Sequence, residues 1–243
     1  MAELFSFVSL IYYIGLMVYV FFLLLLSTLF FRKYLQYKYR ELFLFGLSFF
    51  ILAGVVYIPF VISIFMLLIL GQGLDLFVHA VAIGFSPIIV LTYLAAMSEL
   101  IFKDKQKLIL TIIAVLVAII EIIHFYILFV YGPSYLGYKW EDGVSVSWYP
   151  FVIFYLAITL LIFIISSSIF AYKAYRTNDE ENKLKGIILF LASIFFLFGS
   201  LFESVIVLTG FLSPITRILQ ILGASLYYIG FTLPKKIKKL FLE

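Results

Sequence analysis

Residues 108–131 read LILTIIAVLVAIIEIIHFYILFVY, a run of 24 residues in which Glu121 and His124 are the only acidic or basic side chains. An α-helix needs about 20 predominantly apolar residues to cross the hydrocarbon core of a bilayer. Three lysines, Lys103, Lys105 and Lys107, come directly before the run. The stretch therefore predicts a transmembrane helix that begins at a charged membrane surface.

The composition of the whole chain agrees with this stretch. Of the 243 residues 65% are hydrophobic and 12% are charged, and the mean hydropathy is +1.21. Soluble domains carry about 25% charged residues, so we expect the excess apolar surface to face lipid. The absence of cysteine excludes disulfides and thiolate chemistry. Residues 1–6 contain Glu3 and no lysine or arginine, which argues against a cleavable signal peptide.

Six further apolar runs are separated by charged or turn-rich breaks. We therefore predict an all-α integral membrane bundle, a single seven-helix transmembrane domain over residues 1–243. The expected helices cover about 4–31, 42–69, 76–102, 108–131, 150–172, 186–209 and 213–234. Residues 131–149 form an expected outer loop, and residues 235–243 an expected basic amphipathic tail.

The basic residues predict the orientation of the bundle. Fifteen of the 17 lysines and arginines fall in the first, third and fifth breaks and in the C-terminal tail; Lys139 and Arg217 are the exceptions. These four segments share one side of the membrane only if the chain crosses an odd number of times. The positive-inside rule makes that side cytoplasmic, which places the N-terminus outside and the C-terminus in the cytoplasm.

Two segments outside the expected spans carry their own signals. Residues 137–148, GYKWEDGVSVSW, favour a β-hairpin around Asp142-Gly143 on the outer side. In the tail, Lys235, Lys236, Lys238 and Lys239 alternate with apolar residues, which is typical of a helix lying on anionic lipid at the cytoplasmic face. Once the charges are located there, the net charge of +4 no longer suggests nucleic acid as a partner.

Ionisable groups within membrane spans are costly and usually face the protein interior. Helical spacing and depth predict that the few such groups in this chain converge on a polar, ligand-binding pocket that opens outward. The candidates are His79, Glu121, His124, Glu203, Arg217 and Gln220. Two structural alternatives stay open: an ion pair between Glu203 and Arg217, and a hydrogen-bonded pair of Glu121 and His124. Zinc accepts imidazole and carboxylate ligands, so His79, Glu121, His124 and Glu203 are weak metal candidates.

The expected architecture resembles that of rhodopsins and G-protein-coupled receptors, and of seven-helix receptor-like membrane proteins of archaea and other prokaryotes. The resemblance covers the whole chain, but the signature motifs are missing. Ser98-Glu99-Leu100-Ile101 stands in place of an acidic-Arg-aromatic triplet, and Ser225-Leu226-Tyr227-Tyr228 in place of Asn-Pro-x-x-Tyr. Residues 215–233 contain Arg217 but no lysine for a Schiff base, so we expect no retinal and no other cofactor.

Together these features predict a multi-pass receptor-like sensor of the cell membrane. It would bind a small ligand from outside and signal through a cytoplasmic protein partner, without enzymatic activity of its own. Three alternatives remain: a small-solute transporter, an intramembrane metal hydrolase, and a structural or assembly subunit whose polar residues only hold helices together.

Overall fold

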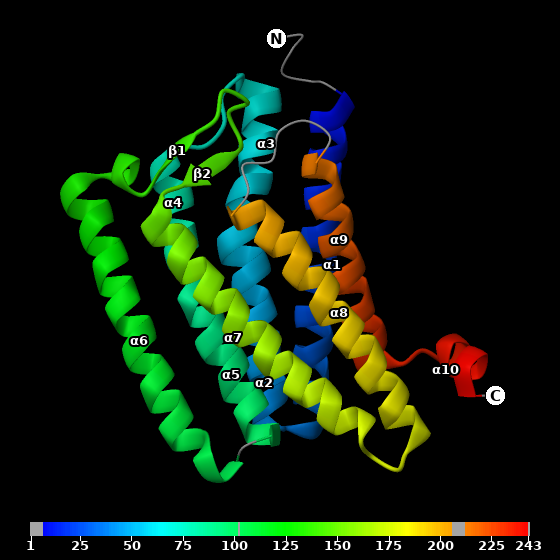
Figure 1. Cartoon of the computed structure of the whole chain (residues 1–243). Coiled ribbons are helices and arrows are strands. Elements are labelled where there is room, and N and C mark those ends of the chain that lie inside the picture. Colours follow the sequence, from blue (N-terminus) through cyan, green and yellow to red (C-terminus); the bar gives the residue numbers. More distant parts are fainter. Residues whose placement is uncertain (1–6, 102, 206–211, 243) are drawn as a thin grey trace.

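The computed structural model describes residues 7–101, 103–205 and 212–242. Within these ranges the chain is a bundle of long helices that carries one short β-hairpin at one end (Figure 1). The helical elements of the first half are α1 Phe7–Tyr37, α2 Arg40–Phe50, η1 Ile51–Tyr57, α3 Ile58–Leu70, α4 Leu76–Gly84, α5 Ser86–Ile101 and η2 Lys103–Lys105. Those of the second half are α6 Gln106–Tyr126, η3 Ile127–Tyr131, η4 Pro133–Tyr135, α7 Pro150–Tyr175, α8 Glu180–Val205, α9 Leu212–Thr232 and α10 Lys235–Leu242.

Six helical stretches of the described chain are long and apolar enough to cross a membrane. They are Ser9–Tyr37, Arg40–Leu70, Leu76–Ile101, Lys103–Tyr131, Pro150–Tyr175 and Glu180–Glu203. This confirms the prediction of an all-α protein with transmembrane helices. The seventh expected span corresponds to α9, which has 21 residues but carries Arg217 and Gln220 and is not among the six. Parts of the expected spans 4–31, 76–102 and 186–209 lie outside the described residues.

Two prolines coincide with interruptions of the long helices. Pro59 follows the π-helical segment η1 and lies in the first turn of α3. Pro87 is the second residue of α5, which begins at Ser86 directly after Phe85, the C-terminal cap of α4. A proline removes a backbone donor and clashes with the preceding turn, and helix kinks occur at prolines and at π-helical turns. Tyr57, the last residue of η1, packs against Tyr19 of α1 with ring centres 5.2 Å apart.

The hairpin predicted around Asp142-Gly143 is confirmed. Strands β1 Gly137–Lys139 and β2 Val146–Trp148 pair antiparallel, with Gly137 opposite Trp148 and Lys139 opposite Val146. Gly143 has a φ of 72°, a conformation that side-chain-bearing residues rarely adopt. The Asp142 carboxylate accepts the backbone N–H groups of Val144 and Ser145 at 3.0 and 2.8 Å, which closes the turn.

The connections that carry the basic residues gather at the opposite end of the bundle. The α1–α2, α5–α6 and α7–α8 connections and α10 lie away from the hairpin (Figure 1). There Lys238 of α10 pairs with Glu181 of α8, and Lys173 donates to the carbonyl of Ile101 at 2.9 Å. The bundle therefore has a hairpin end and a basic end.

Close packing of α8 against α9 organises one side of the bundle (Figure 1). A Cβ atom on Gly199 or Gly223 would lie 2.9 Å and 2.8 Å from backbone nitrogens of the facing helix, those of Gln220 and Phe196. Small residues let helices approach in this way where apolar lipid provides no hydrophobic drive for association. This approach brings the polar residues of α9 next to the last turns of α8.

Candidate functional site

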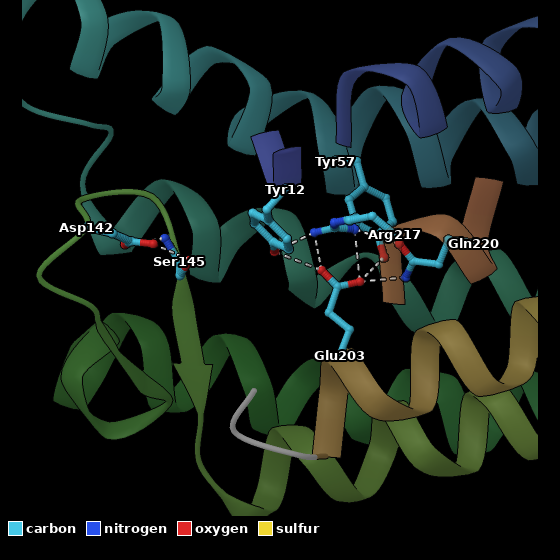
Figure 2. Close-up of polar contacts among 7 residues, drawn as sticks. All are labelled: Tyr12, Tyr57, Asp142, Ser145, Glu203, Arg217 and Gln220. Atoms are coloured by element: carbon cyan, nitrogen blue, oxygen red, sulfur yellow. Dashed lines mark hydrogen bonds and ion pairs between the residues drawn. The ribbon is translucent and has the colours of Figure 1, made fainter. Parts of the chain in front are cut away.

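Arg217 of α9 is the centre of a polar cluster formed by Tyr12, Tyr57, Glu203, Arg217 and Gln220, the Arg217 cluster (Figure 2). Arg217 and Gln220 are buried, and the other three side chains are half-buried. The Arg217 guanidinium donates to both carboxylate oxygens of Glu203, at 3.0 Å to Oε2 and closer to Oε1. It also donates to the Tyr12 hydroxyl at 2.6 Å and to the Gln220 side-chain oxygen at 2.7 Å. The Gln220 amide in turn donates to Glu203 at 2.6 Å.

The cluster joins four parts of the chain. Tyr12 lies on α1, Tyr57 on η1, Glu203 on α8, and Arg217 and Gln220 on α9. The Arg217 guanidinium carbon lies 4.5 Å from the centre of the Tyr12 ring and 5.7 Å from that of Tyr57. Cation–π contacts of this kind stabilise a structure most where the cation is shielded from water. The predicted pairing of Glu203 and Arg217 is therefore present, and it holds α1, η1, α8 and α9 together.

His124 lies apart from the Arg217 cluster. Its side chain is fully buried between α4 and α7, with Nε2 2.9 Å from the Ala80 carbonyl and Nδ1 3.2 Å from the Tyr155 hydroxyl. The ring also fills the space beside Gly84, where a Cβ atom would come within 2.8 Å of it. Both ring nitrogens thus have protein partners, and none of them is Glu121. The predicted pair of Glu121 and His124 does not form.

His79 and Glu121 are also separate from the cluster. The His79 ring is fully buried against Phe60, with ring centres 4.4 Å apart, and its nitrogens make no hydrogen bond within the described part of the chain. Glu121 is half-buried on α6, and its buried Oε1 likewise has no such partner. Of the six residues expected to form one pocket, the structure groups only Glu203, Arg217 and Gln220.

The four weak metal candidates do not come together. Among residues 7–101, 103–205 and 212–242, no three side chains of His, Cys, Asp or Glu are grouped as metal ligands. Glu203 is engaged by Arg217 and Gln220, and His124 by Ala80 and Tyr155. The described residues therefore offer no donor set for the zinc chemistry of a hydrolase.

A cavity of about 560 Å³ lies next to the Arg217 cluster, between the hairpin and the middle of the bundle. We call it the hairpin cavity. The hairpin contributes Trp140, Asp142 and residues 145–148, and the helices contribute mostly aromatic and aliphatic side chains. Glu203, Tyr12 and Tyr57 form a polar part of its wall, and Asp142 and Ser145 lie across from them (Figure 2). Ligand pockets in proteins have this size and this mixture of apolar walls and a few polar groups.

Toward the basic end the cavity meets a layer of packed rings, the aromatic floor. Its members are Phe30, Phe45, Phe49, Tyr93, Phe163, Tyr227 and Phe231. Ring centres lie 4.6 Å apart for Tyr93 and Phe163 and 4.8 Å apart for Phe30 and Phe231. Hydrogen bonds between Tyr93 and Ser167 at 2.7 Å and between Ser193 and Tyr227 at 2.6 Å join the layer to α7 and α8. Phe49, Tyr93 and Phe163 also line the cavity, whereas Phe30, Phe45 and Phe231 lie close to the helix ends that form the basic end.

The hairpin is attached to the loop between α3 and α4. Ser63 donates to the Gly143 carbonyl at 3.3 Å and accepts the Leu74 N–H at 3.0 Å, and Lys139 donates to the Leu74 carbonyl at 2.6 Å. Burial lowers the pKa of Lys139, and the carboxylates of Asp75 and Asp142 oppose that shift. A Cβ atom on Gly73 would lie against the Gly143 carbonyl oxygen. These contacts hold the hairpin over the cavity.

No family model, curated protein or solved structure matches this chain. The candidate site therefore rests on the geometry of its own residues. Tyr12 and Tyr57 belong to it, although the sequence did not single them out. The chain has 18 tyrosines, mostly within apolar runs, and nothing in their spacing marks two of them as partners of Arg217.

Proposed function

We propose that this chain is a receptor-like sensor of the cell membrane that binds a small, largely apolar molecule in the hairpin cavity. The observation that carries the proposal is the cavity itself, about 560 Å³ in volume, covered by the hairpin and walled by aromatic side chains with a polar part at Glu203. Pockets with apolar walls and a few convergent polar groups are the usual sites of small-molecule binding.

The sensor would span the membrane seven times, with the hairpin end outside and the basic end in the cytoplasm. Fifteen of the 17 basic residues support this orientation through the positive-inside rule. Arg217 and Gln220 make α9 less apolar than the other six spans, but within the bundle Glu203 pairs with the charge of Arg217 and both side chains are hydrogen-bonded. The α9 helix is then the seventh span, and α10 lies on anionic lipid of the inner leaflet.

The aromatic floor favours a sensor over a transporter. A transported solute needs a path to both faces, and packed rings lie between the hairpin cavity and the basic end. A ligand that fits one arrangement of the helices better than another shifts their populations. Because the cavity touches α1, α5, α7 and α8, we expect such a shift to reach the basic end, where a cytoplasmic protein partner would detect it.

Fluorescence quenching tests binding, because Trp140 and Trp148 are the only two tryptophans and both line the cavity. The purified full chain in nanodiscs is titrated with the neutral quencher 3-(4-bromophenyl)propan-1-ol. We expect saturable quenching that unbrominated 3-phenylpropan-1-ol reverses. Thr159→Phe, which fills the cavity, should abolish it, whereas Leu161→Phe on the exposed face of the same helix should not. Quenching that is unsaturable or equal in both variants overturns the proposal.

A distance measurement tests sensing separately from binding. The chain has no cysteine, so spin labels at Gln36→Cys and Asn178→Cys report only those two positions near the basic end. Addition of the neutral quencher should change the distance distribution in the wild-type background and leave it unchanged with Thr159→Phe. Saturable binding without any change in distance would show a binding protein that does not signal through these helices.

A further inference from the structure

The charged side chains that line the hairpin cavity within the described chain are all acidic. Asp142 and Glu203 line it, and no lysine, arginine or histidine does so among the described residues. Arg217 is 1% exposed and lies behind Glu203, whose side chain is 22% exposed. The ion pair therefore presents its acidic member to the cavity and keeps its basic member away from it.

The described residues around the hairpin are also acidic overall. Asp75, Glu141 and Asp142 lie there with a single base, Lys139, which is engaged by the Leu74 carbonyl. Clefts lined by one sign of charge raise the local concentration of the opposite charge. The surface beside the cavity thus favours cations over anions.

Asp142 has an acceptor position left for a ligand, and Glu203 has none. Glu203 accepts from Arg217, Gln220, Tyr12 and Tyr57, which fills the roughly four lone-pair positions of a carboxylate. Asp142 Oδ1 accepts two backbone N–H groups, whereas within the described chain Oδ2 accepts only the Ser145 hydroxyl, at 2.5 Å. Oδ2 can therefore accept one more donor.

Aromatic rings form much of the wall of the cavity that Asp142 lines. Ten of the residues that line the cavity are Phe, Tyr or Trp. The Tyr13 side chain is 2% exposed, and its hydroxyl lies beside the Asp142 carboxylate and interacts with it. In the part of the chain that the structure describes, the buried Tyr13 oxygen accepts no hydrogen bond. An ammonium group brings three donors and a charge that favours ring faces. Asp142 Oδ2, the Tyr13 hydroxyl oxygen and the nearby rings match such a group.

From these observations, and resting on the proposed function, we infer that the ligand of the hairpin cavity is an organic cation. Its ammonium group binds between Asp142 and Tyr13 beneath the hairpin, and its apolar body extends toward Phe49 and Phe163. The saturated carboxylate of Glu203 then serves to hold the helices, and Asp142 is the residue that selects for charge.

Three brominated molecules with the same ring and chain length test this inference in the quenching assay. They are 3-(4-bromophenyl)propylamine, 3-(4-bromophenyl)propan-1-ol and 3-(4-bromophenyl)propanoic acid, which are cationic, neutral and anionic at pH 7. We expect the amine to bind at least tenfold more tightly than the alcohol, and the acid to bind most weakly. Excess unbrominated 3-phenylpropylamine should reverse the quenching by the amine.

Two matched variants assign the preference to one carboxylate. Asp142→Asn keeps the side-chain oxygen that closes the turn and should make amine and alcohol bind equally. Glu141→Gln removes the same charge from the exposed neighbouring residue and should leave the preference unchanged. Equal binding of amine and alcohol to the wild type, or a preference that survives Asp142→Asn, overturns the inference while saturable binding of the alcohol still supports the proposed function. If none of the three molecules quenches saturably, both the inference and the proposed function fail.

Discussion

The Arg217 side chain is 1% exposed, whereas the side chain of Glu203, whose carboxylate it binds, is 22% exposed. Removing one member of this ion pair therefore leaves the remaining charge in a different environment from removing the other. Without Glu203, the charge on Arg217 would stay buried with only neutral partners, Tyr12 and Gln220. Without Arg217, Glu203 would still border the cavity and could be solvated through it.

This asymmetry predicts an order of stabilities. Glu203→Gln should cost about 3–5 kcal/mol, since removing one partner of a buried pair leaves an uncompensated charge. Arg217→Met should cost less, and the double variant should lose less than the sum of the two. Unfolding of the chain in mixed micelles measures all three. Glu180→Gln in the exposed Glu180–Lys183 pair is the control and should leave the midpoint unchanged. Additive losses would show that the two side chains do not interact.

The contact between α8 and α9 predicts a steric effect. Gly223→Ala places a Cβ atom 2.8 Å from the Phe196 backbone nitrogen, and backbone cannot move aside as a side chain does. We expect a loss of about 1–3 kcal/mol, the usual cost of overpacking. Gly54→Ala is the matched control, because its nearest neighbour, the Phe50 ring, lies at an ordinary 3.5 Å. Equal midpoints for the two variants would contradict the close approach of these helices.

His124 provides a test of which predicted residues belong to the ligand site. His124→Ala should destabilise the fold by about 1–3 kcal/mol, because it removes the buried hydrogen bonds that His124 makes with the Ala80 carbonyl and the Tyr155 hydroxyl. It should not change the affinity for the brominated alcohol, since His124 is not among the residues that line the cavity. Ser200→Phe, on the cavity wall, should weaken that affinity. A folded His124→Ala variant with weakened binding would return His124 to the site.

The contacts that attach the hairpin to the α3–α4 loop predict an effect on the rate at which a ligand dissociates from the cavity. Gly73→Ala would push the Gly143 carbonyl away from the α3–α4 loop and so loosen the cover of the cavity. We expect faster dissociation of the brominated alcohol, measured by stopped-flow recovery of tryptophan fluorescence. Gly71→Asn is the control, because nothing lies within 4 Å of a Cβ atom there and asparagine tolerates its φ of 74°. Unchanged dissociation in Gly73→Ala would mean that ligands leave by another route.

Single cysteines in the cysteine-free chain test the seven-span orientation. A membrane-impermeant maleimide applied to intact cells should label Glu141→Cys at the hairpin. It should label Lys38→Cys and Lys105→Cys only after the membrane is made permeable, because both would face the cytoplasm. Labelling of Lys38→Cys and Lys105→Cys from opposite sides would exclude seven spans and the proposed orientation together.

The sequence by itself determined the class of the protein. The length of the apolar runs predicts helices that cross a membrane, because an unpaired backbone group in lipid is too costly for other structures. Asp142-Gly143 predicted the hairpin because the turn needs a positive φ at Gly143. Both signals are local, as they depend on neighbours along the chain.

Only the tertiary structure decided which polar residues meet. The positions of His79, Glu121, His124, Glu203 and Arg217 along their helices predicted that all five lie in the outer half of the bundle. Depth does not determine how each helix is rotated or which helix it faces. The ring centre of Tyr57, on the π-helical segment before α3, lies 5.7 Å from the Arg217 guanidinium carbon. Tyr12 hydrogen-bonds Glu203 although 191 residues separate the two along the chain. The cavity likewise depends on contacts between the hairpin and distant helices, which no local pattern encodes.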